Sequence, residues 1–288
     1  MNTIQKTNDQ NNILNFISVK AAGAAYINSD GSLGQEIFAF NIDRKVIHAS
    51  LIKVLVCMVL LDQKVDLKQY IQRTEQDEAK GSGANLKIGD CISIYDALRN
   101  LLLPSSNVTA NMIARIFGTQ ELRDTGQSQI SVEQARRAWV HLLQEKAQSL
   151  GMGHSVFCSP SGLDLLPEDQ FACSTTRDLL RMFAATIRYP DLLSAWSQPL
   201  HVMRIVRDHK IVKLRIKSTV IPMVELDPYV IGGKTGTLTR YGYNLGQIIE
   251  LVNGQRIAVA VLGAKNDTDR TYDMRLLTHY ILNKLNSN

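Results

Sequence analysis

The sequence predicts an α+β fold: an antiparallel sheet built from both ends of the chain, flanked by helices, with an inserted all-helical region. Two observations support this prediction. Segments near both termini are rich in strand-forming residues and end at turn sequences. The middle of the chain instead carries helix-start signals followed by apolar residues at helical spacing. A chain of 288 residues that is 45% hydrophobic and 20% charged can bury the core that such a fold needs.

The predicted strands form two hairpins. Residues 17–28 and 35–42 are joined through an Asp-Gly turn, and Phe38, Phe40 and Ile42 alternate on one face of the second segment. Residues 242–252 and 256–263 are joined through an Asn-Gly turn. Because one hairpin lies near each end of the chain, we expect both ends to contribute to one sheet.

The predicted helices lie mainly between these hairpins, and one closes the chain. Residues 50–61 form a continuously apolar helix, and Met274, Leu277, Ile281 and Leu285 repeat at helical spacing in the closing one. Helix N-caps are predicted at Ser93, Ser131 and Thr175, each followed three residues later by Asp or Gln. We therefore expect a sheet region at 1–48 plus 219–288 and a helical region at 49–218. They would form one catalytic unit with the active site between them.

The composition excludes several classes of protein. No stretch is long and apolar enough to span a bilayer, so no membrane anchor is expected in this chain. The net charge is +5, but there is no arginine-rich run or aromatic RNA motif, so no nucleic-acid partner is expected. The four cysteines and the histidines lack metal-ligand spacing, and we expect no metal and no cofactor.

The first candidate motif is Ser50-Leu51-Ile52-Lys53, at the start of a predicted helix. Residues three apart share a helix face, so the Lys53 amine can lie against the Ser50 hydroxyl. Lysine can activate a serine if its pKa falls from about 10.4 towards neutrality, which burial and a second cation both favour. We predict Ser50 as nucleophile and Lys53 as its base, although the motif alone also fits a solvated pair.

The second candidate motif is Ser105-Ser106-Asn107, directly after Pro104. A hydroxyl and an amide two residues apart on a loop can face one point. Ser105 would then relay a proton to a leaving amine, and Asn107 would hold a substrate amide. Taken alone, the motif is more typical of an N-cap for a helix at 108–117.

The third candidate motif is Lys234-Thr235-Gly236-Thr237. Lys234 would supply the second cation, and Thr235 and Thr237 can bind a substrate carboxylate. Gly236 lets the backbone pass close to a ligand. The backbone N–H groups of Thr237 and Ser50 would form an oxyanion hole. The alternative is a glycine-rich strand with a solvated lysine.

In this order, the three motifs resemble the set found in penicillin-recognising serine enzymes. Residues 20–61 resemble the opening hairpin and nucleophile helix of the D-alanyl-D-alanine carboxypeptidases, low-molecular-mass penicillin-binding proteins of the serine β-lactamase superfamily. Residues 150–164, 174–179, 242–245 and 259–263 resemble later segments of the same family. The resemblance covers about residues 17–285. It implies a β-lactamase/transpeptidase-like fold with a five-stranded sheet.

The resemblance also implies a reaction. Ser50 would attack the penultimate D-Ala carbonyl of a peptidoglycan-type peptide ending in D-Ala-D-Ala, with Lys53 as base. Ser105 and Lys234 would pass a proton to the departing D-Ala, and water would hydrolyse the acyl-enzyme. β-Lactams would act as inhibitors. The family implies the cell envelope or periplasm, whereas the start of this sequence shows no secretory signal, so the cytoplasm is the alternative.

Three other functions stay open. A β-lactamase would share the nucleophile but needs a glutamate to activate the deacylating water. Glu168 is the nearby candidate, and because no asparagine comes after it at the expected position, a solvated loop acid is the simpler interpretation. A cytosolic amidase, esterase or acyltransferase on a non-wall substrate would fit the lack of a leader. A catalytically silent binding module is the non-enzyme alternative, which the presence of every reactive side chain disfavours.

Overall fold

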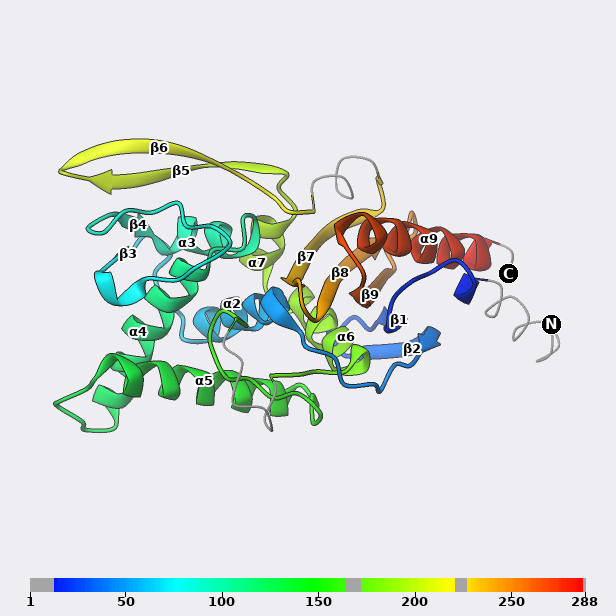
Figure 1. Ribbon diagram of the computed structural model, residues 1–288, viewed down its shortest axis with the longest axis horizontal. Coiled ribbons are helices and arrows are strands. Elements are labelled where there is room, and N and C mark those ends of the chain that lie inside the picture. Colours follow the sequence, from blue (N-terminus) through cyan, green and yellow to red (C-terminus); the bar gives the residue numbers. More distant parts are fainter. Residues whose placement is uncertain (1–12, 164–171, 221–226, 287–288) are drawn as a thin grey trace.

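The computed structural model describes residues 13–163, 172–220 and 227–286. It contains a five-stranded sheet of order β2-β1-β9-β8-β7 and a four-stranded sheet of order β3-β4-β5-β6 (Figure 1). Neighbouring strands in both sheets are antiparallel. The predicted α+β fold class and the five-stranded antiparallel sheet are confirmed.

The five-stranded sheet joins the two ends of the chain. Its strands are β1 (Ala21–Ile27), β2 (Leu33–Phe40), β7 (Val230–Leu238), β8 (Gly242–Glu250) and β9 (Arg256–Ala264). β1 pairs with β9 along its whole length, and this pairing places the first hairpin beside the last. The first strand begins later than predicted. Before it, Ser18 donates its backbone N–H and its hydroxyl to Asp273 on the closing helix, at 3.0 and 2.9 Å.

Two helices cover the faces of this sheet. α6 (Thr176–Ala185) packs on one face and α9 (Asp267–Asn286) on the other. Small residues in the strands permit the close approach of α6. A Cβ built at Gly246 on β8 would lie 2.0 Å from the ring of Phe183 on α6. Thus α6 belongs to the sheet layer in space, although its residues fall within the predicted 49–218 region, whose boundaries stay a prediction.

The inserted region is not all-helical, which corrects that part of the prediction. Its sheet consists of β3 (Tyr70–Gln72), β4 (Cys91–Ser93), β5 (Leu200–Arg207) and β6 (Lys210–Lys217). The sequence feature that could have indicated these two strands is the alternation of apolar residues along β5 and β6. Their turn, Asp208-His209, has left-handed φ values of 47° and 61° without the Gly that usually marks such a turn.

Helices form the rest of the inserted region (Figure 1). They are α2 (Lys53–Asp62), α3 (Ile94–Leu102), α4 (Asn107–Asp124), α5 (Val132–Ser149) and α7 (Pro190–Trp196), with short 3-10 turns at η1 (Ala49–Ile52), η2 (Glu75–Asp77) and η3 (Thr186–Arg188). The predicted N-caps Ser93, Ser131 and Thr175 each accept the expected backbone N–H. None of the helices among the described residues is both long and apolar enough to cross a membrane.

The contact between β8 and α6 gives a prediction about stability. Gly246→Ala should lower the free energy of unfolding by about 1–3 kcal/mol, because its methyl group overlaps the Phe183 ring. Gly153→Ala is the matched control: nothing lies within 4 Å of its Cβ position. We expect it to leave stability unchanged or slightly raised. Chemical denaturation would measure both, and equal stability of Gly246→Ala and the parent would contradict the packing argument.

Candidate active site

Ser50 and Lys53 lie where η1 passes into α2. Lys53 Nζ donates a hydrogen bond to Ser50 Oγ at 2.7 Å. α2 is buried on all sides, so the Lys53 side chain is fully enclosed, while Ser50 is 7% exposed. Ala49, just before the serine, has a left-handed φ of 48°, so the backbone turns sharply there. The structure thus places the predicted base against the predicted nucleophile.

Lys53 has two further hydrogen-bond acceptors. Its amine donates to Asn107 Oδ1 at 2.8 Å and to the Ser161 carbonyl at 2.9 Å. A neutral amine has two N–H groups and one lone pair. If the two N–H groups serve Asn107 and Ser161, the lone pair is directed at the Ser50 hydroxyl. This arrangement lets Lys53 accept the serine proton.

Burial is the main cause of the low pKa of Lys53. Removal of the ammonium from water lowers its pKa well below the usual 10.5, and the positive charge of Lys234 lowers it further. Sequence reasoning identified both effects, and the structure shows that burial is the larger. Burial therefore favours the neutral amine, the form that a general base needs.

Lys234 lies fully buried on β7 and faces the second motif. Its amine donates to Ser105 Oγ at 2.8 Å and to the backbone carbonyl of Thr235 at 2.9 Å. Burial first, and then the charge of Arg270, lower the pKa of Lys234 to about 7. Ser105 has a left-handed φ of 63°, and Ser106 caps α4 through its contact with the backbone N–H of Thr109. The motif therefore acts as a helix cap and also presents Ser105 to Lys234.

Asn107 also lies in the cluster, with both of its polar atoms engaged. Its Oδ1 accepts from Lys53, and its Nδ2 donates to the Lys80 carbonyl at 2.8 Å. In this arrangement Asn107 holds the amine of the predicted base. Its predicted contact with a substrate amide stays a prediction.

β7 packs directly against η1. A Cβ at Gly236 would lie 2.6 Å from the His48 carbonyl oxygen, so only glycine lets the two backbones approach this closely. Thr235 and Thr237 flank this position, and Thr237 is exposed. Thr235 shares a hydrogen bond of 2.7 Å with Thr219. The third motif thus forms a wall beside Ser50, at the edge of the five-stranded sheet.

Sequence reasoning missed Ser161, Thr219 and Arg270 as members of this site. Arg270 Nη1 donates to Thr237 Oγ1 at 3.0 Å, and its guanidinium pairs with Asp267. A cation in the first turn of a helix opposes the helix dipole, and this could have drawn attention to Arg270. The carbonyl of Ser161 leaves no comparable signal, because any residue has one.

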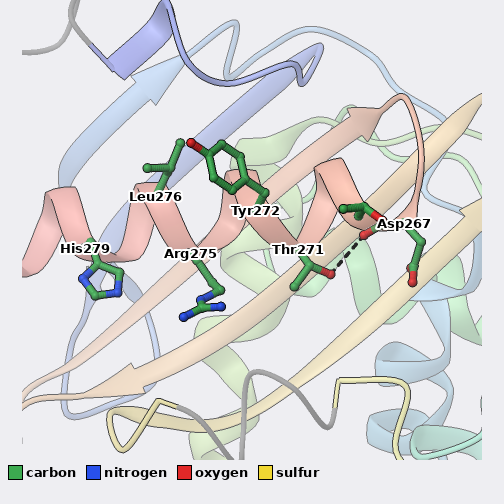
Figure 2. Close-up of a pocket in the computed structure, with 7 residues that line it drawn as sticks. Asp267, Thr271, Tyr272, Arg275, Leu276 and His279 are labelled. Carbon is green, nitrogen blue, oxygen red and sulfur yellow. Dashed lines mark hydrogen bonds between the residues drawn. The ribbon is translucent and has the colours of Figure 1, made fainter.

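A separate hollow of about 620 Å³ runs along the outer side of α9 (Figure 2). Figure 2 shows Tyr272, Arg275 and His279 along it, with Asp267 at one end. Its described lining residues all come from α9 and include none of the predicted site residues. The chemistry-bearing side chains therefore converge elsewhere, between α2, the Ser105 loop and β7.

Comparison with known proteins identifies the family. Residues 10–280 match the beta-lactamase enzyme family, and the chain belongs to it. It is 31% identical over 179 residues to a D-alanyl-D-alanine endopeptidase of Pseudomonas aeruginosa, a match covering 62% of this chain and 51% of the relative. It is 27% identical over 197 residues to a D-alanyl-D-alanine carboxypeptidase of Mycobacterium tuberculosis, covering 67% and 60%. The chain thus spans only half to three fifths of these relatives.

The fold has a close counterpart among solved structures. The Streptomyces K15 DD-transpeptidase superposes with a TM-score of 0.80 at 18% identity, over 92% of this chain and 97% of that one. The family and the names of the relatives indicate a serine hydrolase of the β-lactamase and penicillin-binding superfamily.

The pKa of Lys234 gives a prediction about pH. Lys234 loses its charge as the pH rises through about 7. Acylation by a β-lactam with a free carboxylate, relative to its methyl ester, should therefore fall over the same range. Arg270 lowers the pKa of Lys234, so Arg270→Gln should move the midpoint to higher pH. Intact-mass kinetics would measure this effect.

Arg256→Gln is the matched control, because Arg256 pairs with Glu250 outside the cluster and should leave the midpoint in place. A midpoint that Arg270→Gln leaves unchanged, or moves to lower pH, would refute this electrostatic account.

Proposed function

We propose that this chain is a serine-type D-alanyl-D-alanine carboxypeptidase that forms an acyl-enzyme at Ser50. The observation that carries the proposal is the 2.7 Å contact of Lys53 Nζ with Ser50 Oγ, in surroundings where burial lowers the pKa of the amine. The names of the relatives from Pseudomonas and Mycobacterium support the substrate class. The same substrate class supports a location in the cell envelope.

The first half-reaction is acylation. Lys53 takes the Ser50 proton while Oγ forms a bond to the carbonyl carbon of the penultimate D-Ala. The backbone N–H groups of Ser50 and Thr237 hold the resulting oxyanion. As the C–N bond breaks, the departing amine takes a proton through Ser105, which Lys234 contacts at 2.8 Å. In the second half-reaction, water hydrolyses the ester of the acyl-enzyme and restores the Ser50 hydroxyl.

The carboxylate of the terminal D-Ala binds at the third motif. The hydroxyls of Thr235 and Thr237 donate to it, while Lys234 and Arg270 provide positive charge on either side. This explains why two cations are placed beyond the nucleophile. The fixed distance from these charges to Ser50 would select a scissile bond one residue from the carboxylate.

The rival activities differ in the fate of the acyl-enzyme or in the length of the leaving group. The Pseudomonas relative is named an endopeptidase, so cleavage within a longer peptide is the second candidate. A β-lactamase would require an efficient deacylating base, and Glu168 lies outside the described residues. An amidase, esterase or acyltransferase on a non-wall substrate would share Ser50 and Lys53 but would not need the carboxylate contacts.

The nucleophile assignment is tested by mass spectrometry. Incubation with a penicillin should give one covalent adduct, absent in Ser50→Ala. Lys53→Ala should slow acylation by about 10²–10⁴-fold, the usual loss on removal of a positioned base. Lys68→Ala, which removes an exposed lysine, is the control and should acylate normally. An adduct on Ser50→Ala, or normal acylation of Lys53→Ala near neutral pH, would overturn the assignment.

The second half of the cycle distinguishes the rivals. A β-lactam leaving group stays tethered by the opened ring and blocks the approach of water, whereas released D-Ala diffuses away. We therefore expect a penicillin adduct that lasts minutes, beside measurable D-Ala release from a D-Ala-D-Ala peptide. A nitrocefin time course and a D-Ala assay on one preparation would measure both. Rapid nitrocefin turnover without D-Ala release would identify a β-lactamase. The absence of both nitrocefin turnover and D-Ala release would favour a non-wall substrate.

A further inference from the structure

Positive charge is concentrated on one hairpin of the molecule. β5 and β6 with their turn contain six basic residues and one acidic residue, Asp208. The basic residues are Arg204, Arg207, Lys210, Lys213, Arg215 and Lys217. Their excess of five charges equals the net charge of the whole chain, +5, so all other residues together are neutral. The basic character of this protein is therefore local.

The inner face of this hairpin is paired with acids. Arg207 forms two hydrogen bonds of 2.7 Å with Asp90, and His201 contacts Asp96 at 2.6 Å. Met203 and Ile205 on the same face are buried. Where the fold uses a basic side chain of this hairpin for packing, it thus supplies a carboxylate.

The outer face differs in its charge pairing and in the exposure of its apolar residues. The cross-strand partners there are Val202 with Arg215, Arg204 with Lys213, and Val206 with Ile211. Val202 is 47% exposed and Ile211 is 68% exposed. In the part of the chain that the structure describes, the cations of this face, Arg204, Lys213, Arg215 and Lys217, form no ion pair. Figure 1 shows the β5–β6 hairpin at the outside of the molecule, above β4 and α3 in this view.

The combination of charges and apolar groups defines what could cover this face. Alternate residues of a strand lie about 7 Å apart, so Lys213, Arg215 and Lys217 form a row of charge on the edge strand β6. Arg204 opposite Lys213 adds a like-charge pair, which is unfavourable without an anionic partner. Lysines that only protect a sheet edge would explain the charges but not the exposed Ile211 among them. An anionic bilayer surface accommodates both kinds of side chain.

We propose that the outer face of the β5–β6 hairpin docks peripherally on a bilayer that contains anionic lipids. The cations meet lipid phosphates, while Ile211 and Val202 enter the interfacial region. β6 ends two residues before Thr219, whose hydroxyl contacts Thr235, so docking would hold the candidate active site close to the membrane surface. The proposal does not depend on the acyl-transfer mechanism.

Vesicle co-sedimentation tests this proposal with the full chain. We expect binding to phosphatidylcholine vesicles that contain phosphatidylglycerol, little binding to pure phosphatidylcholine, and weakening with added salt. Reversal of both charges in Arg204→Glu/Lys213→Glu should weaken binding by roughly tenfold or more. This variant keeps a like-charge pair, so circular dichroism should show an intact fold. Lys68→Glu/Arg123→Glu, which reverses two exposed charges outside the hairpin, is the matched control and should bind normally.

The variant Ile211→Ser distinguishes binding to a bilayer from binding to other anions. Partial loss of vesicle binding would support the docking mode, because a bilayer buries the apolar side chain and a soluble polyanion does not. If Ile211→Ser binds normally and soluble polyphosphate binds as tightly as vesicles, the face is a polyanion site and the membrane proposal is wrong. If neither vesicles nor polyphosphate bind, the charges serve only to protect the sheet edge, and the proposal is likewise overturned.

Discussion

The exclusion of water from one lysine amine is the constraint on which the rest of this structure depends. Burying a charged ammonium is energetically unfavourable. The pKa of Lys53 falls because burial destabilises the neutral amine less than the ammonium. Groups from distant parts of the chain surround the Lys53 amine. They are the apolar helix α2, the Asn107 amide, the Ser161 carbonyl and the β7 strand. If any of these groups moved away, water would stabilise the ammonium, and Ser50 would lose its proposed base. The proposed activity would therefore depend on packing as much as on the reactive groups.

Three cationic side chains form an ordered series across the site. Burial lowers the pKa of Lys53 well below its usual value, that of Lys234 falls to about 7, and the guanidinium of Arg270 pairs with Asp267. Burial thus disfavours positive charge beside Ser50, while Arg270 lies near the exposed end of β7. In the proposed reaction, Lys234 and Arg270 would orient a substrate whose negative charge lies beyond the scissile carbonyl. Each lysine also depends on its neighbour, because the pKa of Lys53 responds to Lys234 and that of Lys234 to Arg270.

Precision in the site comes from close backbone contacts at glycines. Gly236 brings β7 against η1, and a Cβ at Gly162 would lie 2.2 Å from the Ala49 carbonyl oxygen, which fixes the neighbouring Ser161 carbonyl beside Lys53. Gly162 also has a left-handed φ of 79°, so it serves both the turn and the approach. The same device joins sheet and helix at Gly246, well away from the reactive groups.

The sequence by itself determined the local features of this protein: the strand hairpins at both ends, the N-caps at Ser93, Ser131 and Thr175, and three motifs whose order resembles that of penicillin-recognising serine enzymes. Each depends on neighbours a few residues apart, which periodicity and turn chemistry report directly. Only the tertiary structure decided that the Ser161 carbonyl and Arg270 join the site, that β5 and β6 complete a second sheet, and which basic side chains of this hairpin acquire an acidic partner. These outcomes depend on contacts between segments far apart in the chain. A single sequence does not specify them, because any residue supplies a carbonyl and a charge acquires its neighbours only when the chain has folded.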